Sequence, residues 1–120
     1  MTPYTAPGIL TPKINPQSII TAVSRIHGVP EHEMTSSGIR SRKISDARHQ
    51  AMFITSKVIK QSWAKLGMIF SRDHSSVIYA VNNVPTLCQV DKEYKRKLIE
   101  CLHSVGYIGT EINKMLNAPN

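Results

Sequence analysis

Residues 72–82 constrain the fold of this chain more than any other segment, because they predict a helix with a polar start and a buried continuation. Asp73 is a favourable N-cap residue. Four small apolar residues follow at helical spacing on one face: Val77, Ala80, Val81 and Val84. The residues at the helix start are rich in donors and acceptors and carry little bulk: Arg72, Asp73, His74, Ser75 and Ser76. This segment is therefore predicted to expose its first turn and to bury its later turns.

The rest of the chain predicts further helices and no strands. It has no apolar pattern of period two and no Asn-Gly hairpin turn. Helix starts are indicated by N-cap residues and by proline in the first turn. The expected helices run from Asn15-Pro16 to near Gly28, over 30–34, from a cap at Ser45 or Asp46 to about Ile59, over 63–70 after Ser62, from Asp73 until Pro85 closes the helix, and from Asp91 to about Val105. The predicted fold is an all-α, compact bundle of about six helices containing a helix-turn-helix.

The chain of 120 residues has the length of one domain and carries 41% hydrophobic residues, enough for a modest core. Three of its seven prolines fall in residues 1–13, which predicts an irregular N-terminal arm. The helical domain is expected over 14–106 and a C-terminal tail over 107–120, after Gly106 and Gly109 interrupt the pattern. Residues 35–43, with one apolar residue, Ile39, predict an exposed basic loop.

The positive charge of the chain is concentrated in one segment. The sequence has 15 Lys and Arg against 8 Asp and Glu, a net charge of +7. Residues 40–72 alone hold eight cations and one acid, Asp46, so the whole excess precedes the 73–84 helix. Such clustering is typical of a nucleic-acid binder, although a basic run by itself is more often a solvated face. An exposed, polar helix start of this kind is what a helix-turn-helix protein places in the DNA major groove.

Other classes of protein have less support. Cys88 and Cys101 lack metal-ligand spacing and are expected to be buried thiols. Asp73 and His74 would form an acid/base pair in a nuclease, but no second carboxylate cluster offers the metal site that a nuclease needs. We therefore expect no enzyme activity, no metal and no cofactor. No apolar stretch approaches the roughly 20 residues that span a bilayer, and no signal peptide precedes the domain, so a cytoplasmic protein is expected.

Three blocks of sequence resemble the C-terminal DNA-binding domain of the bacterial replication initiator DnaA. They are residues 47–54 (Ala-Arg-His-Gln-Ala-Met-Phe-Ile), residues 62–67 (Ser-Trp-Ala-Lys-Leu-Gly) and residues 70–77 (Phe-Ser-Arg-Asp-His-Ser-Ser-Val). The resemblance runs from about Ile14 to about Leu102, and the Arg-Asp-His-Ser-Ser-Val block is its most specific part. It implies double-stranded DNA as the partner, with the 73–84 helix in the major groove and an arginine of the basic loop 36–43 in the minor groove.

The resemblance also assigns roles to particular residues. Base contacts fall on Arg40, in the minor groove, and on Asp73, His74, Ser75 and Ser76. Phosphate contacts fall on Arg42, Lys43, Arg48, Ser62, Trp63, Lys65 and Arg72. An arginine suits a narrow A/T minor groove because the negative potential is enhanced there, and helix N-terminal amides bind phosphate without a side chain.

The chain also departs from the family. Ser71 alone stands where the family usually has two glycines, and Ser75 and Ser76 replace residues that are often threonine. No G-x-x-x-x-G-K-[ST] phosphate loop is present, so the ATPase domain of the family and a nucleotide ligand are not expected. A stand-alone regulator of replication or transcription is the favoured interpretation. The alternative is an interaction adaptor that keeps the fold but has lost base recognition, and the charge over 40–72 favours DNA binding.

Overall fold

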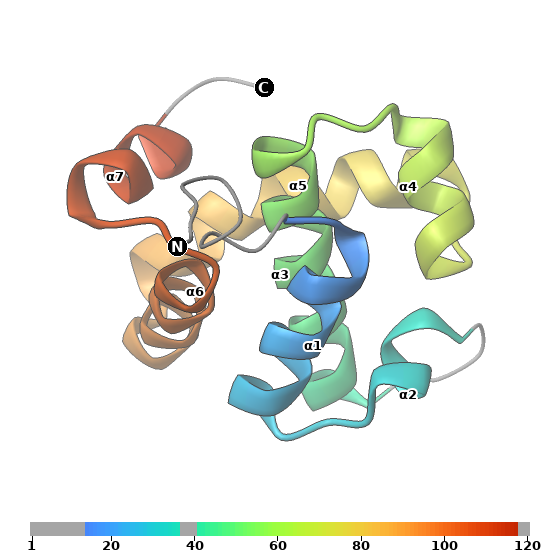
Figure 1. Ribbon diagram of the computed structural model, residues 1–120, viewed down its shortest axis with the longest axis horizontal. Coiled ribbons are helices and arrows are strands. Elements are labelled where there is room, and N and C mark those ends of the chain that lie inside the picture. The colour runs from blue at the N-terminus through green and yellow to red at the C-terminus, as the bar shows by residue number, and fades with distance from the viewer. Residues whose placement is uncertain (1–13, 37–40, 118–120) are drawn as a thin grey trace, which may run out of the picture.

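The computed structural model describes residues 14–36 and 41–117, and in this part of the chain it contains helices and no strands (Figure 1). The seven helices are α1 (Pro16–His27), α2 (Glu31–Thr35), α3 (Arg42–Val58), α4 (Trp63–Phe70), α5 (His74–Val90), α6 (Lys92–Ser104) and α7 (Gly109–Asn117). The all-α fold predicted from the sequence is confirmed.

Four helix starts have the capping geometry that the sequence predicts. The side chain of Asn15 accepts from the Ser18 N–H at 2.8 Å and forms a capping box at the start of α1. Ser62 caps α4, Asp73 caps α5 and Asp91 caps α6, each through its side-chain oxygen. These local hydrogen bonds fix where the helices begin before any tertiary contact forms.

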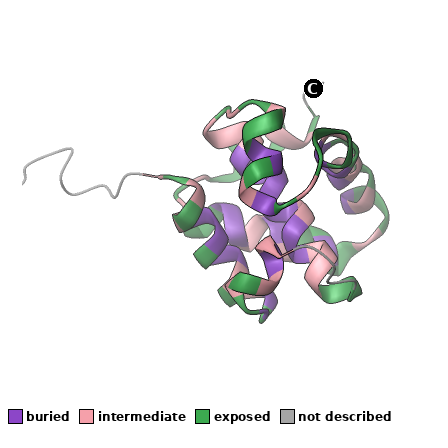
Figure 2. Ribbon diagram, turned by 90° about the vertical axis from the view of Figure 1, so that its right-hand side faces the viewer, coloured by how far each residue is buried: buried purple, intermediate pink, exposed green. Residues whose placement is uncertain are grey.

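Helix α3 lies at the centre of the fold and packs against α1, α5, α2 and α4. In the described residues, buried positions lie on the inner faces of the helices and exposed positions on the outer faces (Figure 2). The largest buried side chains come from several helices. Among them are Ile19 of α1, Phe53 and Ile54 of α3, Phe70 of α4 and Leu98 of α6, each 0% exposed. Burying a side chain of this size stabilises the fold by roughly 1.5–3 kcal/mol.

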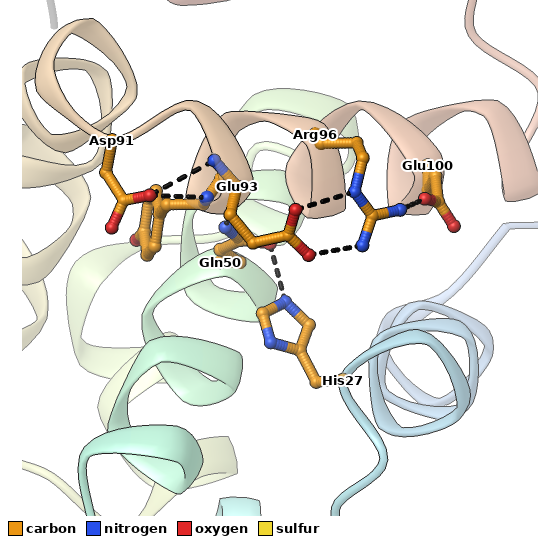
Figure 3. Close-up of polar contacts among 7 residues, drawn as sticks. His27, Gln50, Asp91, Glu93, Arg96 and Glu100 are labelled. Atoms are coloured by element: carbon orange, nitrogen blue, oxygen red, sulfur yellow. Dashed lines mark hydrogen bonds and ion pairs between the residues drawn. The ribbon is translucent and has the colours of Figure 1, made fainter.

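A chain of polar contacts crosses the core and joins α1, α3 and α6 (Figure 3). His27 Nε2 donates to Gln50 Oε1 at 2.7 Å, and Gln50 Nε2 donates to the Tyr94 backbone oxygen at 2.8 Å. Burial lowers the pKa of His27, so the neutral imidazole is the buried form. The surface of α6 is held by Arg96, which pairs with Glu93 and Glu100 on its own helix (Figure 3).

Helix α3 begins earlier than the sequence predicts, so the expected cap at Ser45 or Asp46 is wrong. Ser41 occupies the N-cap position without a side-chain hydrogen bond, and the Ser45 N–H donates to the Ser41 oxygen at 2.9 Å. Arg42 lies in the first turn and pairs with Asp46 four residues later at 3.3 Å. The backbone hydrogen bonds of this turn therefore form without a side-chain cap, which is the signal by which helix starts were predicted from the sequence. As a result, Arg42 and Lys43 lie on a helix and not in the predicted loop.

Helix α5 continues through Pro85 to Val90, so the expectation that Pro85 closes it is also wrong. Proline removes one backbone donor from a helix interior. Beyond it, Cys88 is buried and Leu87 packs against the core, and the Asp91 N–H donates to the Leu87 oxygen at 2.9 Å. Tertiary packing of this last turn outweighs the local cost of the proline.

Both cysteines are buried thiols, as expected: Cys88 on α5 and Cys101 on α6. Burial raises the pKa of Cys88 to about 11 and that of Cys101 to about 12. The segment expected as a C-terminal tail contains α7, whose Ile112 is 3% exposed. The two glycines that interrupt the sequence pattern lie before and at the start of this helix and do not prevent it. The expected arm over residues 1–13 lies outside the described residues.

Candidate nucleic-acid interface

Helices α4 and α5 are joined by a very tight turn of Ser71, Arg72 and the cap residue Asp73. Ser71 adopts a left-handed conformation, with φ 56° and ψ 46°, and its N–H and that of Arg72 both donate to the Gly67 oxygen. Gly67 makes the close approach possible: a Cβ added there would lie 2.4 Å from the Arg72 carbonyl oxygen. The two helices and this turn form a helix-turn-helix.

The first turn of α5 is presented to solvent. We call Asp73, His74, Ser75 and Ser76 the reading turn, and all four residues are exposed. The opposite face of the helix is anchored, since Val77, Val81 and Val84 are 0% exposed. The backbone hydrogen bond from Ser76 to the Asp73 carboxylate lowers the pKa of Asp73, which keeps this group ionised and able to accept hydrogen bonds. Side chains fixed in this way can address base edges without rearranging the helix.

Two arginines beside the reading turn bond to the backbone that ends α2. Arg48 Nε donates to the Met34 oxygen at 3.0 Å, and an Arg48 terminal nitrogen reaches the Glu33 oxygen at 3.5 Å. Arg72 Nη1 donates to two backbone oxygens, that of Ser36 at 3.2 Å and that of Ser71 at 2.9 Å. The backbone of residues 33–36 is thereby tied to α3 and to the helix-turn-helix.

Arg48 is a buried cation, with only 3% of its surface exposed. Burial, with the charge of Arg72 as a second cause, lowers its pKa to about 10, so the guanidinium keeps its proton at neutral pH. The end of α2 packs against Arg48 and offers it the Met34 and Glu33 carbonyl oxygens as acceptors, a tertiary arrangement that the sequence does not reveal. A phosphate contact by Arg48 stays a prediction, beside this structural role.

The other residues predicted to touch phosphate lie in different places. Ser62, Lys65 and the half-buried Trp63 lie together at the start of α4, where the Lys65 N–H donates to the Ser62 hydroxyl at 3.1 Å. The exposed Lys43 lies on another face of α3, next to Gly28, and lines a small pocket with His27 and residues of α6. The structure therefore does not bring Lys43 together with the reading turn. Arg40 lies outside the described residues.

A cleft opens between α3 and α5, directly beside the reading turn. Its volume is about 410 Å³. We call it the α3–α5 cleft, and it is lined by Arg48, His49, Met52, Arg72, Ser75, Ser76 and Tyr79. Sequence reasoning did not single out His49 and Tyr79. The sequence spacing could have indicated Tyr79, because Tyr79 follows Ser75 by four residues and Ser76 by three and so lies on the same helix face.

In the described ranges, no three His, Cys, Asp or Glu side chains come together in a way that would hold a metal ion. Within the same ranges, no helix is both long and apolar enough to cross a membrane.

The tight helical pair, its polar first turn and the cationic cleft beside it define the class of DNA-binding helix-turn-helix domains. The family model "Bacterial dnaA protein helix-turn-helix" matches residues 16–84, more than half of the sequence. The chain belongs to this family, as the resemblance implied.

Individual relatives agree with this assignment. The chromosomal replication initiator protein DnaA of Thermus thermophilus is 32% identical over 80 residues, which cover 66% of this chain and 18% of the relative. DnaA 1 of Chlamydia muridarum is 30% identical over 90 residues, 74% of this chain and 19% of the relative. DnaA of Tropheryma whipplei is 33% identical over 81 residues, 68% of this chain and 17% of the relative. The chain spans about a fifth of the length of these relatives.

Proposed function

We propose that this chain binds double-stranded DNA sequence-specifically, at sites of the DnaA-box type, and regulates replication or transcription. The reading turn would enter the major groove. Arg40 would enter the minor groove, and phosphates would be met by Arg42, Arg72 and the start of α4. No nucleotide and no cofactor takes part in this binding.

One observation carries the proposal: all four residues of the reading turn are exposed, while the same helix is anchored in the core within the next turn. An anchored helix start holds its polar groups in fixed positions, as base recognition requires. Asp73 accepts hydrogen bonds, and His74, Ser75 and Ser76 offer both donors and acceptors.

The alternative function is an adaptor that keeps the fold without reading bases. The charge argues against it, because an adaptor has no use for eight cations and one acid over residues 40–72. Part of this excess lies beside the reading turn, at Arg48 and Arg72, and part at the exposed Lys65 on α4. Lys43 lies beside Gly28 and α6, and Lys57 lies over the Phe53 ring. Fewer of these cations can therefore contact one DNA ligand than the sequence suggests.

The direct test is an unbiased selection of binding sites from random duplex DNA with the purified protein. We expect an enriched motif with a major-groove half and an A/T-rich flank. In a parallel selection, Arg40→Ala should lose the A/T flank and keep the major-groove half, because a minor-groove side chain distinguishes mainly A·T from G·C. Recovery of random sequence only would favour the adaptor. A flank that persists in the variant would make Arg40 a phosphate contact.

The electrostatic part of the proposal is tested by salt. If about five or six phosphates are neutralised, the logarithm of the binding constant should fall against the logarithm of salt concentration with a slope of roughly −4.5 to −5.5. Fluorescence anisotropy with the selected duplex measures this slope. Affinity that does not change with salt would contradict DNA binding through this surface.

A further inference from the structure

The α3–α5 cleft is lined almost entirely by groups that can donate hydrogen bonds. Two guanidinium groups and an imidazole come from Arg48, Arg72 and His49, and three hydroxyls come from Ser75, Ser76 and Tyr79. No carboxylate lines it, although Asp73 is next to it in the sequence and Asp46 lies earlier on α3. A ligand of this cleft must therefore be mainly an acceptor, and an anion fits best.

Positive charge is concentrated at the cleft in the free protein. The pKa of Arg48 is lowered by burial and then by the charge of Arg72. The pKa of His49 is lowered by burial first and then by Arg48, with a smaller opposing effect of Asp46 and a further lowering by Arg72. Groups that depress one another's protonation in this way would all gain from a negative charge placed between them.

Tyr79 is one of the large side chains that the fold leaves exposed, at 68% of its surface. It lies one helical turn after the reading turn, on the same face of α5, and its ring borders the cleft. Met52 beneath the cleft is 1% exposed, so the site has a packed base. The phenol therefore stands at the rim of a cationic cavity, where its hydroxyl can donate to a bound anion.

We propose that the α3–α5 cleft binds one backbone phosphate of duplex DNA, and that His49 and Tyr79 contact this phosphate together with Arg72. The inference rests on the proposed function and adds to it two contacts and their ligand. A phosphate is favoured over a base edge because base edges present donors as well as acceptors, whereas a phosphate only accepts. Seated beside the reading turn, such a phosphate would fix the register of α5 in the groove.

Proton uptake is a consequence of this geometry. A phosphate offsets the charges of Arg48 and Arg72, and the imidazolium form of His49 becomes favourable next to it. Binding should therefore tighten as pH falls from about 8 to 6. The groups that face His49 are Arg48 and Asp46 on α3, Arg72 in the turn, and Ser75, Ser76 and Tyr79 on α5. The reading turn also carries a histidine, His74, so the effect belongs to His49 only if His49→Gln abolishes it.

The experiment combines variants with chemically modified DNA. In a series of duplexes, each phosphate of the selected site is replaced in turn by an uncharged methylphosphonate, and affinity is measured by fluorescence anisotropy. Tyr79→Phe and His49→Gln remove the two contacts and little else. Tyr107→Phe and His103→Gln make the same exchanges away from the cleft and are the matched controls.

Among the phosphates that the protein contacts, we expect one at the α3–α5 cleft whose neutralisation weakens wild-type binding by roughly tenfold, in keeping with a charged hydrogen bond. Tyr79→Phe and His49→Gln should weaken binding by about threefold to tenfold on unmodified DNA and hardly at all on the duplex that lacks this phosphate charge. Equal losses on both duplexes, or no loss on either, with sequence-selective binding retained, would overturn this inference and leave the proposed function standing. Absence of all duplex binding would overturn both.

Discussion

Gly67 of α4 faces the carbonyl oxygen of Arg72 so closely that position 67 has no room for a side chain. A Cβ at this position would lie 2.4 Å from that oxygen, and the neighbouring atom is backbone, which cannot swing aside. The spacing of α4 and the reading turn therefore depends on the absence of one methyl group.

Gly67→Ala is expected to destabilise the protein by about 1–3 kcal/mol, because α4 and α5 must move apart. Thermal unfolding followed by circular dichroism measures the effect. The matched control is Gly109→Ala, since an added Cβ at Gly109 meets nothing within 4 Å. If both variants melt alike, the close approach at Arg72 does not constrain the turn.

Ser71→Gly is expected to stabilise the protein by roughly 0.5–1 kcal/mol. Ser71 has a left-handed backbone with φ 56°, which costs energy for any residue with a Cβ and almost none for glycine. Lys60 has φ 61° outside this turn, so Lys60→Gly gives a parallel measurement. A lower melting temperature of Ser71→Gly would show that the serine stabilises the turn in another way.

His74→Ala is expected to cost on the order of 1–3 kcal/mol of binding free energy on the selected duplex and little on random DNA. His74 is exposed on the reading turn, so the substitution should leave the fold intact. Lys65→Ala, at the exposed start of α4, is the comparison, because loss of a phosphate contact weakens binding to both duplexes about equally. Equal losses for His74→Ala on both duplexes would mean that the reading turn does not read bases.

Stability is expected to fall as pH falls below about 6.5, the ordinary pKa of histidine. Burial lowers the pKa of His27 in the folded protein, so below that pH the unfolded chain takes up a proton that the folded one does not. The contribution is complete above pH 6.5 and is lost toward the lower, folded-state pKa, at no more than about 1.4 kcal/mol per pH unit.

Melting temperatures of the wild type and of His27→Gln between pH 7.5 and 5.5 check this expectation. Glutamine keeps a donor for Gln50 but does not titrate, so the variant should lose part of the pH dependence. His49 contributes in the same direction, because burial lowers its pKa as well, and some dependence should therefore remain. A difference between the two proteins that stays constant over this range would contradict a buried neutral His27.

The features that the sequence predicted correctly depend on interactions between residues close together in the chain. Caps at Asn15, Ser62, Asp73 and Asp91 act within three residues of themselves, so the starts of four helices were readable in advance. The apolar stripe of α5 likewise identified the buried face, since Val77 and Val81 recur with the helical period. The exposed reading turn follows from these two facts together.

Tertiary packing decided the rest. Pro85 should end a helix by its own chemistry, yet α5 continues because Cys88 has a place in the core. Arg48 looks in the sequence like any surface cation, and only the approach of α2 to α3 buries it against the Met34 carbonyl. The α3–α5 cleft also depends on tertiary packing, because His49 and Tyr79 are 30 residues apart and meet only when α3 packs on α5.

The sequence by itself determined the helices and the residues that the reading turn exposes, since both depend on neighbours along the chain. The tertiary structure determined which charges face the site, because that depends on neighbours in space.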